Sequence, residues 1–286
     1  MRVLVTGGAG FVGTNLIKRL LDDGHNVISI DNYSTGKKEN HQEGCRYWNF
    51  DLSDKRNDVL ERDEYDIIYH IAALARIQPS LADPYKSIYN NFVSTLHILE
   101  RSRLNNIPVV YAGSSTFHHG LYSSPYAWSK YSGEELCKLY SSVYDLNTSI
   151  CRFYNVYGSY QLEEGDYSTV LGIFEKQYRE GKSLTITADG KQRRDFTHID
   201  DIVDGLIKCS EHKFKAEFFE LGSGVNFSIN EVADMFGKDY PREYLSARKG
   251  EYDRTLCDYS AAKLKLGWSP SKSLKDYIKT VTSDKS

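Results

Sequence analysis

The chain has 286 residues, of which 40% are hydrophobic and 26% are charged, and its formal net charge is -3 at pH 7. This length allows one large domain or two domains of ordinary size, each with its own core. Lysine and arginine are scattered along the chain, so the composition argues against a protein that binds nucleic acid or an anionic membrane.

The sequence also lacks the segments that direct a protein into or across a membrane. It contains no run of eighteen apolar residues, and Met1 leads directly into an apolar strand pattern without a charged leader and a cleavage site. The five cysteines show neither CxxC nor zinc spacing, which is typical of packing residues in a reducing compartment. We therefore expect a cytoplasmic protein.

Short apolar strands alternate with helical segments over the first half of the chain. We predict strands at residues 2–6, 27–30, 46–50, 67–71, 109–112 and 148–153, and helices at 11–23, 59–62, 85–104 and 125–144. Strands that alternate with helices imply a parallel sheet with helices on both faces. The sequence therefore predicts a doubly wound α/β domain over residues 1–158.

The alternation weakens after residue 158. Loops rich in glycine and charged residues separate a predicted helix at 170–180, a strand at 184–187 and a helix at 199–210. We expect residues 159–286 to form mainly a smaller α/β lobe that binds the substrate. A strand near 218–226 could return to the main sheet, so the boundary need not be a single cut in the sequence.

A cluster of glycines lies between the first strand and the first helix. Gly7, Gly10 and Gly13 follow the spacing GxxGxxG, which lets the backbone turn tightly and approach a pyrophosphate at a helix N-terminus. Asp31 ends the second strand, where a carboxylate can bind the ribose hydroxyls of an adenosine. This carboxylate would repel a 2′-phosphate, and no arginine follows it, so NAD is the expected cofactor.

The glycine spacing, together with D-N-Y-S-T-G (31–36), F-D-L (50–52) and H-I-A-A (70–73), resembles the extended short-chain dehydrogenase/reductase family. The resemblance implies a Rossmann fold, with Asp51 and Leu52 beside the adenine. For Asp51 alone, a helix cap is the alternative. The cofactor contacts that the resemblance implies are Gly7, Gly10, Phe11, Val12, Gly13, Asp31, Asn32, Ser34, Gly36, Asp51, Leu52, Ala72, Ala73, Asn91, Tyr126 and Lys130.

The segment S-S-P-Y-A-W-S-K (123–130) begins the predicted helix at 125–144. With Ser124 as N-cap and Pro125 as the first helical residue, Tyr126 and Lys130 lie four residues apart on one face. A tyrosine with its ordinary pKa near 10 is ionised in roughly one molecule in a thousand at pH 7, and a nearby ammonium lowers that pKa. On its own, the pair is as well explained by packing, because the chain has 22 tyrosines.

In the family that the chain resembles, this tyrosine is the base, and a serine or threonine after the preceding strand binds the reacting oxygen. Counting back five residues from Gly120 selects Ser115, with Thr116 as the second choice. The resemblance therefore implies Ser115, Tyr126 and Lys130 as the catalytic residues.

Further segments resemble nucleotide-sugar 4-epimerases, and the likeness runs over essentially the whole chain. They are A-R-I-Q-P-S (75–80), R-F-Y-N-V-Y-G (152–158), R-R-D-F-T-H-I-D-D (193–201), R-K-G-E (248–251) and D-Y-S-A-A-K-L-K-L-G-W-S-P (258–270). The resemblance implies that Arg194 and Arg248 clamp the diphosphate of a UDP-sugar, which suits the guanidinium fork. A solvated charge is the alternative for Arg248. The implied substrate contacts are Ser115, Thr116, Tyr126, Asn155, Val170, Arg194, Arg248, Glu251 and Thr255.

The residues after Ser115 narrow the expected reaction. Family dehydratases and decarboxylases carry an acidic residue just after the active-site hydroxyl, whereas Thr116, Phe117, His118 and His119 follow here. We therefore expect a UDP-hexose 4-epimerase that interconverts UDP-glucose and UDP-galactose through a 4-keto sugar and transient NADH. The paired histidines are interpreted as surface residues.

Thr255 aligns with a position where a bulky tyrosine excludes N-acetylated sugars in some relatives, so UDP-N-acetylglucosamine is a further expected substrate. Only five residues separate Gly120 from Tyr126, which leaves the choice of sugar less certain than the reaction.

The alternatives are a UDP-glucuronate 4-epimerase, another NAD-dependent nucleotide-sugar oxidoreductase and an NAD-sensing scaffold. The helices near 85–104 and 126–144 resemble those of a homodimer interface in relatives.

Overall fold

The computed structural model describes residues 1–54 and 57–283. A central sheet of seven parallel strands runs in the order β11-β6-β5-β4-β1-β2-β3, which confirms the predicted doubly wound sheet. Its strands are β1 (Arg2–Thr6), β2 (Asn26–Asp31), β3 (Arg46–Asn49), β4 (Ile67–His70), β5 (Val109–Ser114), β6 (Thr148–Phe153) and β11 (Lys215–Leu221).

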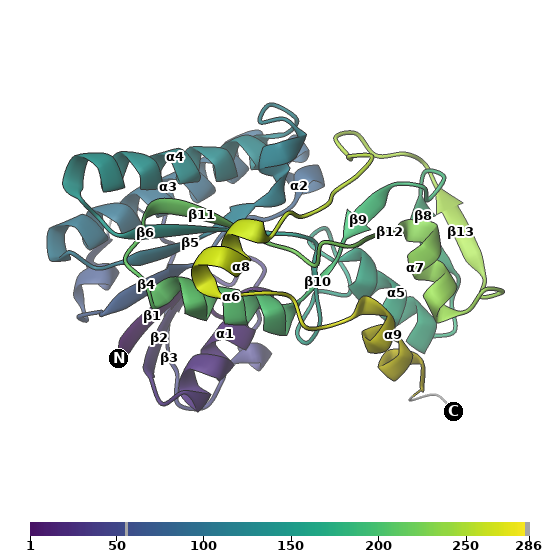
Figure 1. Cartoon of the computed structure of the whole chain (residues 1–286), viewed down its shortest axis with the longest axis horizontal. Helices are drawn as coiled ribbons and strands as arrows, with labels where there is room; N and C mark the ends of the chain where they lie inside the picture. Colours follow the sequence, from purple (N-terminus) through teal and green to yellow (C-terminus); the bar gives the residue numbers. More distant parts are fainter. Residues whose placement is uncertain (55–56, 284–286) are drawn as a thin grey trace.

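Helices cover both faces of this sheet (Figure 1). On one face lie α1 (Phe11–Asp22), α6 (Ile199–Ser210) and α8 (Ser260–Leu266); on the other lie α3 (Pro84–Asn105) and α4 (Pro125–Tyr144). Successive residues of β1 point to opposite faces, so Val3 packs against the α1 side and Leu4 against the α3 side. Burial on both faces explains why the strands are continuous apolar runs.

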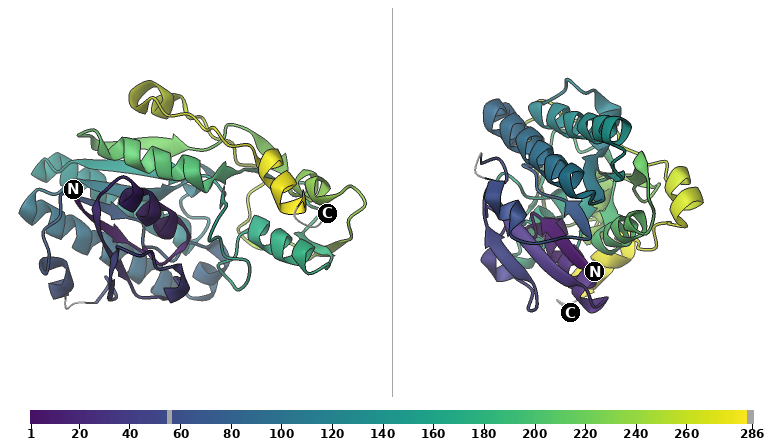
Figure 2. Two further views of the ribbon diagram at one scale, coloured as in Figure 1. Left: turned by 90° about the horizontal axis from the view of Figure 1, so that it is seen from below. Right: turned by 90° about the vertical axis from the view of Figure 1, so that its left-hand side faces the viewer.

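The other elements form a smaller lobe beside the main domain, joined to it by several segments of the chain (Figure 2). Its helices are α5 (Val170–Arg179), α7 (Ile229–Phe236) and α9 (Leu274–Ser283). Its strands are β8 (Leu184–Thr187), β9 (Arg193–Asp195), β12 (Asn226–Ser228) and β13 (Arg242–Leu245), and the short β7 (Val156–Tyr157) pairs with β10 (Thr197–His198). Phe174, Ile186 and Phe236 lie in the core of this lobe.

Short elements complete the described chain. They are α2 (Ile77–Ala82) and the 3-10 helices η1 (Lys38–Asn40), η2 (Asn57–Glu61) and η3 (Ser115–His119). No helix among the described residues is both long enough and apolar enough to cross a membrane.

Helix α4 begins where the sequence predicts. The Ser124 side chain accepts a hydrogen bond from the Ala127 N–H at 3.1 Å, and Pro125 is the first helical residue. A serine cap followed by proline fixes the start of a helix, because the serine accepts from one of the unpaired N–H groups and the proline has no N–H to leave unpaired. Tyr126 and Lys130 are therefore held in the first turns of α4.

A buried group of charges lies under the carboxyl ends of β6 and β11. The side chain of Arg152 on β6 is 2% exposed and pairs with Glu134 on α4 at 2.6 Å and with Glu220 on β11 at 2.9 Å. Glu220 also accepts hydrogen bonds from Tyr154 and from His118 of η3, each at 2.8 Å. His118 is exposed, as the sequence analysis predicts, and its hydrogen bond to Glu220 also ties η3 to the sheet.

Lys130 is buried next to this group. Its ammonium lies 4.3 Å from the centre of the Tyr111 ring, a favourable cation–π contact. Burial lowers the pKa of Lys130 to about 8, and the Glu134 carboxylate one turn along the helix opposes that shift. The charged form of Lys130 therefore weakens the folded state near neutral pH.

Lys130→Met should raise the free energy of unfolding of the ligand-free protein at pH 7. The pKa of about 8 in the folded state, against 10.5 ordinarily, sets an upper limit on the gain of about 3 kcal/mol. The lost cation–π contact offsets part of it. Between these two pH values the unfolded chain binds more protons, so wild-type stability rises with pH and the gain shrinks.

Urea unfolding of both proteins at several pH values between 7 and 10.5 measures this difference. Lys138→Met is the control, because Lys138 lies on the same helix with its side chain 43% exposed. A gain that stays constant with pH would contradict the assignment to Lys130 ionisation.

Candidate active site

A cavity of about 800 Å³ opens at the carboxyl ends of the sheet strands, between the main domain and the lobe. Ligands bind at this edge in open α/β sheets. Every predicted site residue lines the cavity except Gly36 and Lys130. Residues that are far apart in the sequence, such as Gly7, Tyr126 and Thr255, therefore share one site.

The glycine turn is fitted closely to its surroundings. Gly7 has φ +72°, and a Cβ atom there would lie 2.9 Å from the Cα of Ala72. A Cβ on Gly13 would lie 2.2 Å from the Gly7 carbonyl oxygen. Gly10 is the N-cap residue of α1 and has no side chain to accept from the first N–H groups of the helix. These N–H groups are therefore available to an anionic phosphate. The turn fits the pyrophosphate of a dinucleotide.

Asp31 is held in place by the backbone of the same turn. Its carboxylate accepts hydrogen bonds from the N–H groups of Ala9 at 2.9 Å and Tyr33 at 2.8 Å. Burial raises the pKa of Asp31, and these two hydrogen bonds offset only part of that rise. A Cβ on Gly36 would lie 3.0 Å from the Asp31 carboxylate. The absence of a side chain at Gly36 therefore leaves room for the Asp31 carboxylate.

Three of the predicted cofactor contacts are linked to one another. Asn32 donates to the Asp51 carboxylate at 3.0 Å, and Ser34 donates its N–H to Asn32 at 3.0 Å. Asp51 also accepts from the N–H of Ser53 at 2.8 Å, a local turn that resembles the capping role considered above. The ends of β2 and β3 are therefore fixed together at the cavity wall.

Asn91 of α3 uses its amide to hold the chain after β4. It accepts from the Leu74 N–H at 2.8 Å and donates to the Leu74 carbonyl at 3.3 Å and to Ser129 at 2.9 Å. The side chain also lines the cavity. In the structure, Asn91 positions the loop that begins with Ala72 and Ala73.

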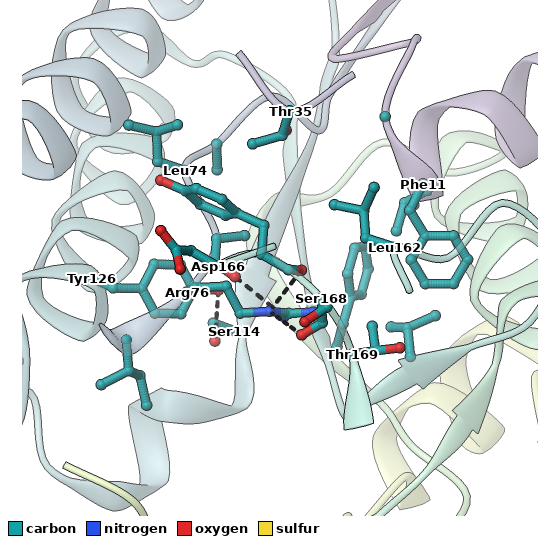
Figure 3. Close-up of a pocket in the computed structure, with 18 of the residues that line it drawn as sticks. Phe11, Thr35, Leu74, Arg76, Ser114, Tyr126, Leu162, Asp166, Ser168 and Thr169 are labelled. Carbon is teal, nitrogen blue, oxygen red and sulfur yellow. Dashed lines mark hydrogen bonds between the residues drawn. The ribbon is translucent and has the colours of Figure 1, made fainter. Parts of the chain in front are cut away.

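Tyr126 points into the cavity and donates its hydroxyl to Ser114 Oγ at 3.4 Å, as Figure 3 shows. Burial raises the pKa of Tyr126, and the Ser114 hydrogen bond and the charge of Arg76 offset only part of that rise. Ser114 also accepts from the Thr116 hydroxyl at 3.0 Å. The predicted Ser115 is the next residue, so three successive residues with hydroxyl groups, Ser114, Ser115 and Thr116, line the same cavity as Tyr126.

The lobe forms the opposite wall, where Val170, Arg194, Arg248 and Glu251 line the cavity. Burial lowers the pKa of Arg194, and Glu251 opposes this shift. Arg248 is exposed. The two guanidinium groups give this wall the charge that a diphosphate requires.

Thr255 is buried at the back of the same wall. Its hydroxyl accepts hydrogen bonds from the Asn155 amide at 3.2 Å and from the Asp195 N–H at 2.9 Å. Asn155 also donates to the Asp195 carbonyl at 2.8 Å. The small side chain of Thr255 is thus part of a fixed hydrogen-bonded group.

Three residues of the site were not singled out from the sequence: Ser114, Arg76 and Tyr252. Arg76 donates through Nε to the carbonyls of Tyr167 and Ser168 at 3.1 and 3.3 Å, across the cavity that Figure 3 shows. The Tyr252 ring stacks on His119 at 4.4 Å between ring centres. Arg76 lies in the segment A-R-I-Q-P-S, which follows β4 at the carboxyl edge of the sheet, where ligand-binding residues gather.

No group of three or more His, Cys, Asp or Glu side chains within residues 1–54 and 57–283 is placed to hold a metal ion. The cavity instead combines a phosphate-binding turn, a ribose-binding carboxylate, a tyrosine beside hydroxyl groups and a cationic wall. This set of groups fits a dinucleotide and a second phosphorylated ligand.

Comparisons with known proteins agree with this geometry. The model of the NAD dependent epimerase/dehydratase family matches residues 3–222. The chain is 32% identical to UDP-glucose 4-epimerase of Mycolicibacterium smegmatis, with 98% of this chain and 97% of that protein covered.

Two solved structures are similar over nearly the whole chain. The Thermotoga maritima UDP-glucose 4-epimerase with UDP-glucose has a TM-score of 0.92 and 29% identity, and the match covers 99% of this chain and 98% of that one. The Bacillus cereus UDP-glucuronic acid 4-epimerase with UDP-glucuronic acid and NAD has a TM-score of 0.89 and 29% identity, with the same coverage. The chain therefore belongs to the NAD-dependent epimerase/dehydratase family of extended short-chain dehydrogenases/reductases, enzymes that use NAD and act on nucleotide sugars.

Proposed function

We propose that the protein is a UDP-hexose 4-epimerase that interconverts UDP-glucose and UDP-galactose. The observation that carries this proposal is the pairing of Tyr126 with Ser114 beside a segment, Ser115–His119, that contains no carboxylate. Dehydration and decarboxylation need a further acid or base at that place, whereas 4-epimerisation needs one group that takes and returns a proton.

The residues of the cavity have distinct parts in this reaction. Tyr126 takes the proton of the sugar 4-hydroxyl, and the neighbouring hydroxyl groups of Ser114 and Ser115 bind the same oxygen. The glycine turn and Asp31 would hold NAD, which would supply the acceptor and donor of the C4 hydride. The resulting 4-keto sugar turns over before the hydrogen returns to its other face. Arg194 and Arg248 hold the diphosphate during this rotation.

The activity is tested by incubating the protein with UDP-glucose, UDP-N-acetylglucosamine or UDP-glucuronate, without added reductant, and identifying products by NMR. We expect UDP-galactose without net NADH. UDP-glucuronate is included because a related structure binds UDP-glucuronic acid. Tyr126→Phe should lower turnover by at least about a hundredfold, because it removes the acid/base group.

An oxidised sugar with net NADH would contradict the proposal and indicate a dehydrogenase. NAD binding without turnover of any of the three sugars would indicate a sensor or scaffold. Ser114→Ala and Ser115→Ala, compared with each other, distinguish which hydroxyl binds the reacting oxygen.

Thr255→Tyr should lower turnover of UDP-N-acetylglucosamine at least about tenfold more than turnover of UDP-glucose, because the larger ring takes the space of the N-acetyl group. The matched control is Thr255→Ser, which keeps the hydroxyl that Asn155 and Asp195 contact. Steady-state kinetics with both sugars measures the effect. An equal loss for both sugars would show that Thr255 is not the selecting residue.

We also propose that the protein is a homodimer through α3 and α4. On α4, Leu139 is 51% exposed and Val143 is 60% exposed, and residues four apart lie on one helix face. Burying this stripe against a second copy removes apolar surface from water. Leu139→Glu should convert a dimer to a monomer in sedimentation velocity, with Lys138→Glu as the surface control. A monomeric wild-type protein would contradict this proposal.

A further inference from the structure

A loop of the lobe, residues 246–253, reaches across to the main domain, and we call it the strap. In Figure 1 the chain leaves β13, runs toward α2 and then continues to α8. At one end of the strap, the Leu245 carbonyl accepts from the Ala188 N–H at 2.9 Å. At the other end, the Asp253 carbonyl accepts from the Arg193 N–H at 2.8 Å. Both ends are therefore fixed within the lobe.

The middle of the strap is held by the main domain. The Gln78 amide of α2 donates to the Lys249 carbonyl at 2.7 Å. The hydroxyl groups of Ser123 and Tyr252 share a hydrogen bond of 3.1 Å. The Tyr252 ring also stacks on His119 of η3, with 4.4 Å between ring centres. Three segments of the main domain therefore fasten a loop that begins and ends in the lobe.

Gly250 lets the strap approach α2 closely. Its φ is +80°, in the left-handed region, and a Cβ atom there would lie 3.1 Å from Cγ2 of Ile77. This distance is shorter than ordinary van der Waals contact, so a side chain at residue 250 would push the strap away from the helix. The backbone of the strap is thus fitted to the main domain at this point.

The strap carries two residues that the family resemblance assigns to the nucleotide. Arg248 and Glu251 line the cavity, and both are exposed. Fixing an exposed loop costs conformational entropy, and a ligand that has to order the loop binds more weakly. Lys249 follows Arg248 and Tyr252 follows Glu251, so each of these two residues is next to one that the main domain holds.

We propose that Gln78 and Ser123 are positioning residues that hold the strap closed before the substrate binds, so that Arg248 and Glu251 are already placed for its UDP part. The inference rests on the part of the proposed function that places UDP in this cavity, and it does not depend on the sugar. The described residues that line the cavity include Gln78 but not Ser123. Ser123 therefore acts on the ligand only through Tyr252.

The experiment measures the Kd of UDP for the NAD-loaded protein by isothermal titration calorimetry. Gln78→Met/Ser123→Ala removes both hydrogen bonds and should raise this Kd about tenfold, with each single variant raising it less, because each bond contributes only modestly. The apparent affinity falls with the fraction of molecules in which the strap stays closed. NAD binding, measured separately, should not change, because the glycine turn and Asp31 form another part of the cavity.

Tyr252→Phe removes the Ser123 hydrogen bond from its other side. In the Gln78→Met background, Tyr252→Phe and Ser123→Ala should raise the Kd of UDP by the same factor, and combining them should add nothing. The matched control is Tyr244→Phe, which removes a 3.1 Å hydrogen bond from Tyr244 to Asn230 within the lobe. It should leave UDP binding unchanged.

Steady-state kinetics with UDP-glucose separates positioning from catalysis. In Gln78→Met/Ser123→Ala, KM should rise by about the same factor as the Kd of UDP, whereas kcat should change less than about twofold. The reason is that Tyr126 and its Ser124 cap are not altered. A fall in kcat with KM unchanged would overturn the proposal, because it would mean that Gln78 and Ser123 act on the chemical step.

Three binding results would also overturn it. They are an unchanged Kd of UDP in the double variant, equal weakening of UDP and NAD binding, and failure of the wild-type protein to bind UDP. A Kd raised by Tyr252→Phe but not by Ser123→Ala would mean that Tyr252 binds UDP directly, which removes the role of Ser123. Because the titration uses UDP alone, a raised Kd supports the strap even if the protein turns over none of the three sugars.

Discussion

The buried Arg152 side chain is the constraint on which the site depends. Its ion pairs join β6 to α4 through Glu134 and to β11 through Glu220, and Glu220 in turn binds His118 of η3. The tyrosine of the site lies on α4 and the serines lie at the end of β5 and the start of η3. A pair of buried charges loses several kcal/mol when one partner is removed, so these elements cannot shift independently.

The features that could be predicted from the sequence are those with local causes. The alternation of strands and helices, the glycine turn and the Ser124 cap each depend on residues close together in the chain. The set of residues around the cavity also followed, because the family resemblance names positions at the carboxyl ends of parallel strands. What could not be predicted is which neighbour a side chain selects. Ser114 rather than Ser115 contacts Tyr126, since the turn from β5 into η3 sets the direction of each hydroxyl.

Arg76 shows the same limit over a longer distance. Its partners, the carbonyls of Tyr167 and Ser168, lie about ninety residues further along the chain. Every residue has a backbone carbonyl, so the sequence does not show which carbonyls a side chain contacts. The electrostatics of the cavity follow from such contacts. Arg76, Arg194 and Arg248 line the cavity, whereas the ammonium of Lys130 rests on the Tyr111 ring.

The position of β11 has a consequence for how the protein folds and how it can be divided. This strand completes the main sheet beside β6, yet it is made only after α5 and much of the lobe. A growing chain that has reached residue 158 lacks β11, α6 and α8, and Arg152 is then without Glu220. The main domain is therefore not an autonomous folding unit. The last strand of the sheet, β11, also carries the buried Glu220 carboxylate. The sheet is therefore completed only after much of the lobe has been synthesised.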